Sequence, residues 1–328
     1  MGQKNISRRK FIKITSATTA GMALETNLLN AFSSDRLDPK GLPTRTLGNT
    51  GVKIPLIAVG TGSRYCAMKD EDEALDLLSY ALDNGLYYWD TAYIYAYGSV
   101  ISEERLGKII KDRRKEIFIS TKCSTRDPEE AKKSIEESLT RLQTDHVDIL
   151  KVHSIEDLDD LKEITKKGGL YDILLSMKEQ GVTRFIGFSG HNSDQAMAKA
   201  ALDYNFDTML VALNHYSGDG DKFEELAVSA ATKKNMGVMV MKVIRPRETV
   251  VGLSAHDLIK YALSLKNVNG AVIGMDSMKV LKESIDLLRT FKPLTEERMN
   301  ELRMSLAPFY KNRNLDWMQT DYHDGLWV

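Results

Sequence analysis

The sequence has little cysteine, almost no net charge and no long apolar segment. Its two cysteines, Cys66 and Cys123, are too few for a disulfide framework or a CxxC metal site, and we predict no metal. The formal net charge is -1 and the body of the chain has no lysine or arginine run, which argues against nucleic acid or an anionic membrane as the main partner. No apolar run is long enough to cross a bilayer, so we expect no membrane span in the mature protein.

The first residues carry a pattern of their own. A paired arginine in SRRKFIK, residues 7–13, precedes a mildly apolar run of small residues, ITSATTAGMAL. This pattern resembles a twin-arginine (Tat) export signal. We therefore expect residues 1–34 to be a signal segment cleaved near residues 31–34, with the Tat translocon as a partner and the periplasm as the destination. The alternative is a basic N-terminal tail on a cytoplasmic protein.

The body of the chain alternates short apolar segments with amphipathic ones. The apolar segments read as parallel strands buried on both faces: residues 54–60, 86–92, 116–122, 146–153, 183–190, 208–213, 237–243 and 270–275. Between them, apolar residues spaced at i, i+3 and i+4 predict helices over residues 71–85, 102–114, 127–142, 171–181, 193–205, 222–235, 254–266 and 277–291. Ser102, Asp127 and Ser254 are expected N-caps, and Gly85 and Gly181 are expected at helix C-termini.

Strand–helix units repeated eight times in about 250 residues favour a (β/α)8 TIM barrel, which we place at residues 44–300. The rival fold, an open doubly wound sheet, would need a GxGxxG turn after a strand to bind a dinucleotide, and the sequence has none. TRTLGNTGVKI, before the first strand, predicts a short hairpin that plugs the bottom of the barrel. Residues 301–328 are expected to form an irregular C-terminal tail that packs on the barrel surface or its mouth.

In a barrel of this kind the chemistry lies at the C-terminal ends of the strands. The second, third and fourth predicted strands end at Asp90, Lys122 and His153. Each residue has an ordinary explanation when taken alone: a turn cap, a lysine that reaches solvent, or a core histidine. An acid, an amine and an imidazole at successive strand ends, with a tyrosine nearby, instead indicate an active site.

These residues stand in segments that resemble the aldo-keto reductase family over nearly all of the chain after residue 44. TRTLGNTGVKIPLIAVGTG is similar to the opening of the family, WDTAYIY to its Asp-Thr-Ala-x-x-Tyr segment, IFISTK to its lysine strand and VDILKVH to its histidine strand. IGFSG and AVIGMDSMKVLKES are similar to its nicotinamide and adenosine segments. The resemblance implies a metal-free barrel that transfers hydride between NAD(P)H and a small-molecule carbonyl, or from an alcohol in the reverse direction.

The resemblance also implies a catalytic tetrad of Tyr95, Lys122, Asp90 and His153. A free tyrosine has a pKa of about 10, which makes it a weak acid for protonating a developing alkoxide. A buried ammonium beside the phenol favours phenolate, and a carboxylate keeps that ammonium charged and in place. Lys122 and Asp90 are expected in these two roles. His153 is expected to donate a hydrogen bond to the substrate oxygen.

Three tyrosines compete for the role of proton donor. The family places this tyrosine five residues after the aspartate, which gives Tyr95, but the spacing to the following Ser-Glu-Glu fits Tyr97. Two extra residues therefore lie between Asp90 and Ser102. A loop after Tyr95 tolerates an insertion, whereas an insertion before Tyr97 would displace the phenol from the amine. We choose Tyr95, keep Tyr97 as the contender and assign Tyr93 to packing or the substrate wall.

The resemblance places the cofactor, NADP(H) or NAD(H), in a cleft between strand ends. Its nicotinamide end is expected at Gly60, Thr61, Ser189, Met241 and Lys242. Three positions depart from the usual Asn, Gln and aromatic residue of the family: Gly190, Leu210 and Met241, although Asn214 is retained nearby. The adenosine end is expected at Gly274, Ser277, Lys279 and Glu283. The phosphate-binding lysine and arginine of NADP-preferring members are replaced by Gly274 and Val280, so the sequence does not decide between NADP(H) and NAD(H). Arg245 and Arg247 either reach the pyrophosphate or are solvated.

Other functions stay open from the sequence. The altered cofactor residues are also compatible with a catalytically altered barrel that acts as a ligand-binding or interaction module. A Schiff-base chemistry on Lys122 would need this amine without a carboxylate partner, which Asp90 opposes. Cys66 and Cys123 are expected as buried thiols or, in an oxidising compartment, as a pair. The substrate is expected to be selected by residues 154–169 and by the C-terminal tail.

Overall fold

The computed structural model of the chain describes residues 36–213, 222–244, 252–310 and 326–327. The predicted signal segment lies outside these ranges. So do three residues that the sequence suggested for the cofactor cleft: Asn214, Arg245 and Arg247.

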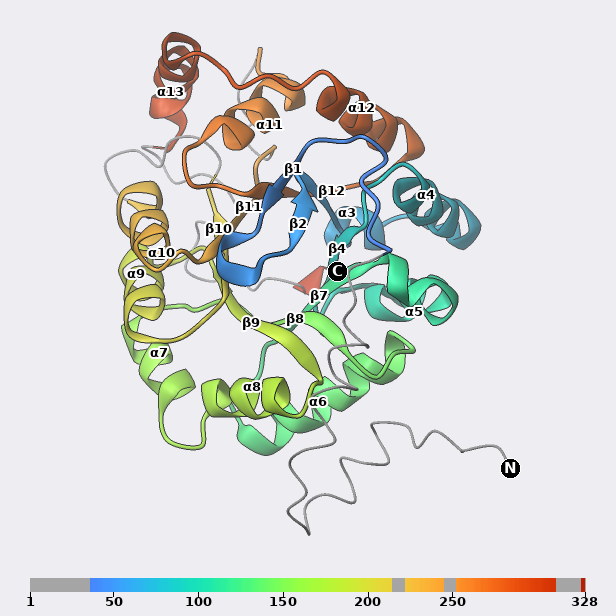
Figure 1. Ribbon diagram of the computed structural model, residues 1–328, viewed down its shortest axis with the longest axis vertical. Coiled ribbons are helices and arrows are strands. Elements are labelled where there is room, and N and C mark those ends of the chain that lie inside the picture. The colour runs from blue at the N-terminus through green and yellow to red at the C-terminus, as the bar shows by residue number, and fades with distance from the viewer. Residues whose placement is uncertain (1–35, 214–221, 245–251, 311–325, 328) are drawn as a thin grey trace.

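Parallel strands form a closed barrel in the order β10-β11-β12-β3-β4-β7-β8-β9 (Figure 1). The strands are β3 Ile57–Gly60, β4 Tyr88–Asp90, β7 Phe118–Cys123, β8 Val147–Val152, β9 Thr183–Gly190, β10 Thr208–Ala212, β11 Gly237–Met241 and β12 Gly270–Gly274. Nearly all of their residues are buried, because helices cover the outer face and side chains fill the interior. The (β/α)8 barrel expected from the sequence is confirmed.

Amphipathic helices surround the barrel (Figure 1). They are α4 Glu71–Asp83, α5 Ser102–Arg113, α6 Pro128–Arg141, α8 Leu170–Glu179, α9 Asp194–Asp203, α11 Ala255–Ser264 and α12 Met278–Arg289, with short turns α3 Ser63–Cys66 and η2 Arg114–Glu116. The predicted N-caps Asp127 and Ser254 accept hydrogen bonds from backbone N–H groups of the first turn. Gly85 and Gly181 follow α4 and α8 in the left-handed conformation, with φ of 91° and 70°. No helix in the described ranges has the length and apolarity to cross a membrane.

Three helical segments differ from the prediction. The helix expected over residues 222–235 begins as a π-helix, η3 Phe223–Val228, and continues as α10 Ser229–Lys233. The expected loop after β8 contains α7 Leu158–Thr165, and α13 Glu296–Tyr310 extends into the residues expected to be irregular. A helix as short as α7 is stabilised by tertiary contacts more than by its own periodicity, and for this reason the pattern missed it.

The N-terminal hairpin closes the bottom of the barrel, as predicted. β1 Thr44–Thr46 and β2 Lys53–Pro55 pair antiparallel around the turn η1 Gly48–Thr50. Leu47 is fully buried in this turn, and a Cβ on Gly237, the first residue of β11, would lie only 2.6 Å from its Cγ. Figure 1 shows the hairpin across the centre of the barrel. The chemistry is therefore left to the opposite end, where the strands terminate.

A second small sheet lies at those C-terminal strand ends. β5 Ala96–Tyr97 and β6 Val100–Ile101 form an antiparallel hairpin directly after Tyr95. β13 Leu326–Trp327 pairs with β5 in parallel, so the end of the chain lies beside this hairpin. The segment between Tyr95 and Ser102 is thus a hairpin that accommodates extra length without moving Tyr95.

Candidate active site

Asp90, the last residue of β4, lies between two lysines inside the barrel. Its Oδ2 accepts a hydrogen bond from Lys122 Nζ at 2.6 Å. Its Oδ1 accepts from Lys151 Nζ at 2.5 Å and from Ser120 Oγ at 2.5 Å. Burial alone would raise the pKa of Asp90, but the two ammonium groups outweigh it and hold that pKa well below its usual range. The ionised carboxylate therefore keeps both lysines charged and in place.

Lys122 connects this carboxylate to Tyr95. Its Nζ donates to Tyr95 Oη at 3.1 Å and to the Thr91 carbonyl at 2.7 Å, and lies 4.5 Å from the centre of the Tyr95 ring. Tyr95 is 7% exposed, and its backbone is held by hydrogen bonds with Ala92 and Ser102. An ammonium in contact with a phenol oxygen stabilises the ionised form of the phenol. The Schiff-base alternative is disfavoured, because Lys122 is committed to a carboxylate.

The other two tyrosines lie differently. Tyr97, in β5, is 39% exposed. The Tyr93 hydroxyl donates to Glu137 Oε2 at 2.6 Å, and the Arg141 guanidinium lies 4.4 Å from the centre of its ring. The geometry therefore favours Tyr95 over Tyr97 as the proton donor, and Tyr93 packs on the side of α6.

His153 follows β8 directly and faces Tyr95. The two ring centres are 5.6 Å apart in an edge-to-face arrangement. Ser124 Oγ lies 3.0 Å from His153 Nδ1, and Arg126 donates to the His153 carbonyl at 3.0 Å while it pairs with Asp160. These contacts hold the imidazole at the strand end. All four residues of the predicted tetrad thus gather in one buried cluster.

Lys151, the second lysine on Asp90, was not predicted from the sequence. Lys151 lies opposite Lys122 in the register of β7 and β8, so both side chains enter the barrel. A Cβ at Gly187 on β9 would lie 3.3 Å from Lys151 Cγ and 2.3 Å from Thr208 Oγ1, so this glycine leaves the room that the lysine stem occupies. The signal was present: Lys151 stands two residues before His153, on the same face of the strand.

Ser102 is not the helix cap that the sequence predicted, and this is a correction. Ile101 is the N-cap of α5, without a side-chain hydrogen bond. The buried Ser102 hydroxyl instead bonds the Thr61 carbonyl at 2.8 Å, and Thr91 Oγ1 lies 2.9 Å from it. Burial decides against the cap, because a hydroxyl enclosed by two strand ends must form its hydrogen bonds there. This network fixes the backbone that follows β3 and β4.

Glu103, the next residue of α5, was also missed. It is fully buried behind β7, and Thr121 Oγ1 donates to its Oε1 at 2.6 Å. Burial raises the pKa of Glu103 to about 7, although hydrogen bonds from Thr121 and Ser138 and the charge of Arg141 act in the opposite direction. The sequence could not reveal this, because an acid in the first turn of a helix usually faces solvent.

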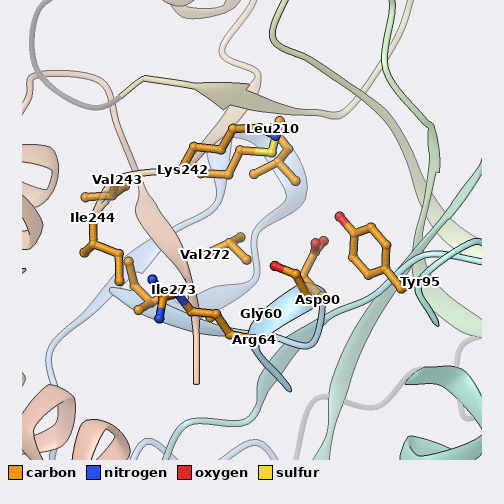
Figure 2. A pocket seen from close by; sticks show the side chains of 14 residues that line it. Gly60, Arg64, Asp90, Tyr95, Leu210, Lys242, Val243, Ile244, Val272 and Ile273 are labelled. Atoms are coloured by element: carbon orange, nitrogen blue, oxygen red, sulfur yellow. The ribbon is translucent and has the colours of Figure 1, made fainter. Parts of the chain in front are cut away.

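A cavity opens beside the tetrad (Figure 2). It is lined by Gly60, Gly62, Ser63, Arg64, Asp90, Tyr95, Leu210, Met241, Lys242, Val243, Ile244, Val272, Ile273 and Gly274. Four predicted cofactor residues are among them: Gly60, Met241, Lys242 and Gly274. Figure 2 shows Asp90 and Tyr95 on one side, with their oxygens toward the cavity, and Val243 and Ile244 on the opposite side.

The other predicted cofactor residues are not among those that line this cavity. Thr61 donates to the Asp90 carbonyl at 3.0 Å, and Ser189 Oγ accepts from the Ser154 N–H at 3.0 Å. Ser277 caps α12, where its side chain accepts from the Val280 N–H. Lys279 and Glu283 form an exposed ion pair at 4.0 Å on the surface of α12.

The cavity fits a nicotinamide dinucleotide. It has apolar walls and two glycines at strand ends, and it leads from the Tyr95 hydroxyl to the connection between β12 and α12. Two positively charged residues line it as well: Lys242, and Arg64, which pairs with Asp276 at 2.8 Å. Lys242 has a φ of 60°, a conformation that side chains other than glycine seldom adopt and that recurs at ligand sites. Within the described residues, no group of three or more His, Cys, Asp or Glu is arranged to hold a metal ion.

The two cysteines are free and buried. Cys66 packs against Ala92 and Tyr95, while Cys123 Sγ lies 3.4 Å from Ser134 Oγ. Burial raises the pKa of the Cys66 thiol to about 11. The structure therefore shows two buried thiols and not a disulfide pair.

Comparisons with known proteins agree with this geometry. The sequence model of the Aldo/keto reductase family matches residues 57–245. L-galactose dehydrogenase of Arabidopsis thaliana is 28% identical over 322 residues, which cover 83% of this chain and 96% of that protein. The aldo-keto reductase yakc [NADP(+)] of Schizosaccharomyces pombe is 28% identical over 210 residues, which cover 59% of this chain and 58% of that protein. The solved structure of aldo-keto reductase AKR11C1 from Bacillus halodurans has a similar fold, with a TM-score of 0.64 at 20% identity over 80% of this chain and 96% of that one.

The matched family segment spans more than half of the chain and contains Asp90, Tyr95, Lys122 and His153. Enzymes of this family are oxidoreductases that use NADP(H) or NAD(H), which is the cofactor class that the cavity fits. The chain therefore belongs to the aldo/keto reductase family.

Proposed function

We propose that this oxidoreductase interconverts an aldehyde or ketone and the corresponding alcohol, with Tyr95 as the group that exchanges a proton with the substrate oxygen. One observation carries the proposal: the Lys122 ammonium contacts both the Asp90 carboxylate and the Tyr95 hydroxyl inside a buried cluster beside the cavity. A phenol stabilised in this way is a usable acid and base near neutral pH.

Each residue of the cluster has a separate task in this proposal. In the reducing direction Tyr95 donates its proton to the substrate oxygen, and Lys122 stabilises the phenolate that remains. Asp90 holds Lys122, and His153 orients the carbonyl by a hydrogen bond. The nicotinamide, when bound, supplies or accepts the hydride at the substrate carbon. The apolar cavity wall at Leu210 excludes water from the reacting groups.

The substrate class is proposed from a relative that aligns over most of this chain. L-galactose dehydrogenase aligns with most of this chain, and by its name it oxidises a sugar. We therefore propose a small polyhydroxylated alcohol, or the carbonyl compound made from it, as the first substrate class to test. The residues between β8 and α8, which include α7, and the β13 segment that pairs with β5 are the parts of the chain that we propose select among such substrates.

The experiment separates cofactor binding from turnover. Fluorescence titration of the protein with NADPH and with NADH is performed on the wild type, Tyr95→Phe and the matched control Tyr97→Phe. We expect Tyr95→Phe to bind the reduced cofactor as tightly as the wild type but to lose turnover by about 100-fold or more, since general acid–base catalysis contributes about that much. Turnover lost only in Tyr97→Phe would transfer the role to that residue. A protein that binds neither cofactor would instead be a ligand-binding module.

We also propose that the SRRKFIK segment directs Tat export to the periplasm. Tat transports folded proteins, so the enzyme would be exported with its cofactor already bound. Replacement of Arg8 and Arg9 by lysine is expected to retain the protein in the cytoplasm, as cell fractionation would show. Equal periplasmic amounts of the wild type and the double variant would rule out this route, as would export that needs no Tat translocon.

A further inference from the structure

The tetrad lies beside one more positive charge than its tyrosine chemistry requires, the ammonium of Lys151. Asp90 is a single carboxylate, yet it contacts Lys122 through one oxygen and Lys151 through the other. Both ammonium groups are buried, with side-chain exposures of 0% and 1%. An unbalanced charge enclosed in a protein interior is costly, so a neighbouring group that can become negative is driven to do so.

Lys151 cannot relieve this imbalance by moving to solvent. Its Nζ lies 2.5 Å from Asp90 Oδ1, 3.1 Å from Ser120 Oγ and 3.5 Å from Tyr88 Oη. Its stem fills the space that Gly187 leaves open inside the barrel. The ammonium is therefore fixed on the far side of the carboxylate from Lys122.

The acids around the cluster supply at most part of the missing negative charge. Glu103, behind β7, has a pKa raised by burial to about 7, so at neutral pH its carboxyl is only partly ionised. Asp148, on β8, is paired with its own arginines, Arg114 at 3.0 Å and Arg184 at 3.1 Å. Tyr88 has its pKa raised by burial and by the charge of Asp90, so it remains a neutral phenol.

The remaining groups that face the cluster do not balance it either. His153, beside Tyr95, is neutral or positive in any of its protonation states. Arg64 and Lys242, which line the cavity, add positive charge. Apart from Asp90 itself, Tyr95 is the group around the two lysines in the described part of the chain whose ionisable oxygen directly contacts an ammonium and faces the cavity.

We propose that Lys151 is a positioning residue that leaves the Lys122 charge only partly neutralised, and that Tyr95 is consequently a phenolate in the resting site. This inference rests on the proposed function. It would set the enzyme for oxidation: the phenolate would take the proton of the substrate hydroxyl as the C=O bond forms, and a bound oxidised nicotinamide would accept the hydride from the carbinol C–H bond. Tyr95 ends protonated and the cofactor ends reduced, so charge and electrons balance.

Ultraviolet difference absorbance of tyrosinate tests the inference without any substrate. The chain has 13 tyrosines, and ordinary phenols are un-ionised at pH 7. Buried ones such as Tyr87, whose pKa is raised by burial to about 12, remain so as well. A tyrosinate signal at neutral pH that is present in the wild type and absent in Tyr95→Phe therefore reports Tyr95 alone.

The decisive variant is Lys151→Gln, which keeps a hydrogen-bond donor toward Asp90 and removes the charge. We expect its tyrosinate signal to shift to higher pH, because the variant lacks the positive charge that acts on the phenol through Asp90 and Lys122. Lys151→Met provides the same test if the glutamine variant does not fold. The matched control is Ser120→Ala, which removes a neighbouring hydrogen bond to Asp90 with no change of charge, and it should leave the titration in place.

Three results would overturn the inference. They are a wild type without tyrosinate at neutral pH, a Lys151→Gln titration equal to that of the wild type, and a Ser120→Ala shift as large as that of Lys151→Gln. The last result would mean that hydrogen-bond geometry, rather than charge, controls the phenol. An intact tyrosinate shift in a protein without reductase or dehydrogenase turnover would instead reject the proposed function and keep the charge argument.

Discussion

Replacement of Glu103 by glutamine is expected to make the protein more stable as the pH rises above the usual pKa of a glutamate. Glu103 is fully buried between α5 and β7, where Thr121 donates to one of its oxygens. Arg141 Nη1 lies 3.8 Å from the other oxygen, too far for a hydrogen bond. Glutamine keeps the shape and the acceptor oxygen of the side chain but cannot ionise. The comparison therefore isolates the cost of burying one carboxylate.

The size and sign of the stability change follow from the pKa of Glu103, which burial raises from 4.5 to about 7. Between these values the unfolded chain is ionised while the folded protein keeps its proton, so wild-type stability falls as pH rises through this window and stays lower above it. A rise of about 2.5 pH units, at about 1.36 kcal/mol per unit, corresponds to a loss of about 3 kcal/mol. Below about pH 4 the group has no such effect.

The assay is urea unfolding of the wild type and Glu103→Gln at steps from pH 4 to pH 9. The difference in unfolding free energy between the two proteins should grow in favour of the variant by about 3 kcal/mol up to about pH 7 and then remain constant. Any fixed packing cost of the amide cancels in this pH dependence. A flat difference would refute the reasoning, and a difference that grows in favour of the wild type would show that Glu103 is an ionised partner of Arg141.

The remaining predictions concern the ion cluster and the bottom of the barrel. Asp90→Asn leaves two buried ammonium groups without their carboxylate and should lower the unfolding free energy by about 3–5 kcal/mol in urea unfolding; the matched exposed substitution, Asp83→Asn, should cost less than about 1 kcal/mol. Gly48→Ala should lower the midpoint of thermal unfolding far more than Gly41→Ala. Both glycines have a positive φ. A Cβ added at Gly48 would lie 2.2 Å from the backbone of Gly237, whereas a Cβ at Gly41 would have no atom within 4 Å. Equal losses for the two glycine variants would exclude the hairpin as a tightly packed plug.

The barrel and the tetrad could be predicted from the sequence because both depend on local patterns. Apolar runs alternating with amphipathic segments define the strands and helices, and chemistry in this fold is restricted to the strand ends. Asp90, Lys122 and His153 could therefore be selected by position alone. Tyr95 needed more: the family resemblance, which places the tyrosine five residues after the aspartate, and the argument that an insertion is tolerated after it. The β5–β6 hairpin is the form that this segment takes.

The rest of the site depends on contacts between segments that are distant in the sequence. Ser102 looks like a cap, and its burial by two strand ends cannot be read from its neighbours. Ser189 matches a ligand-binding serine, yet its hydroxyl bonds the backbone of the adjacent strand end. The pairing of Lys151 with Lys122 requires the register of β7 and β8, which a hydrophobic pattern does not define. Long-range register and burial are thus the information that the pattern lacks.

Lys151 shows how a charged residue in an otherwise apolar strand can indicate function. Its strand, VDILKVH, is otherwise apolar, and a methionine or leucine at that position would fill the same space without the cost of burying an ammonium. A buried ion pair is weak evidence for stability, so stability does not account for a second lysine on a carboxylate that already has a partner. Positions where a sequence breaks its own local rule, with no compensating gain in packing, are where function is expected. By that criterion Lys151 belongs with the tetrad, because the charge that makes it unfavourable for folding is the charge that acts on Tyr95 through Asp90 and Lys122.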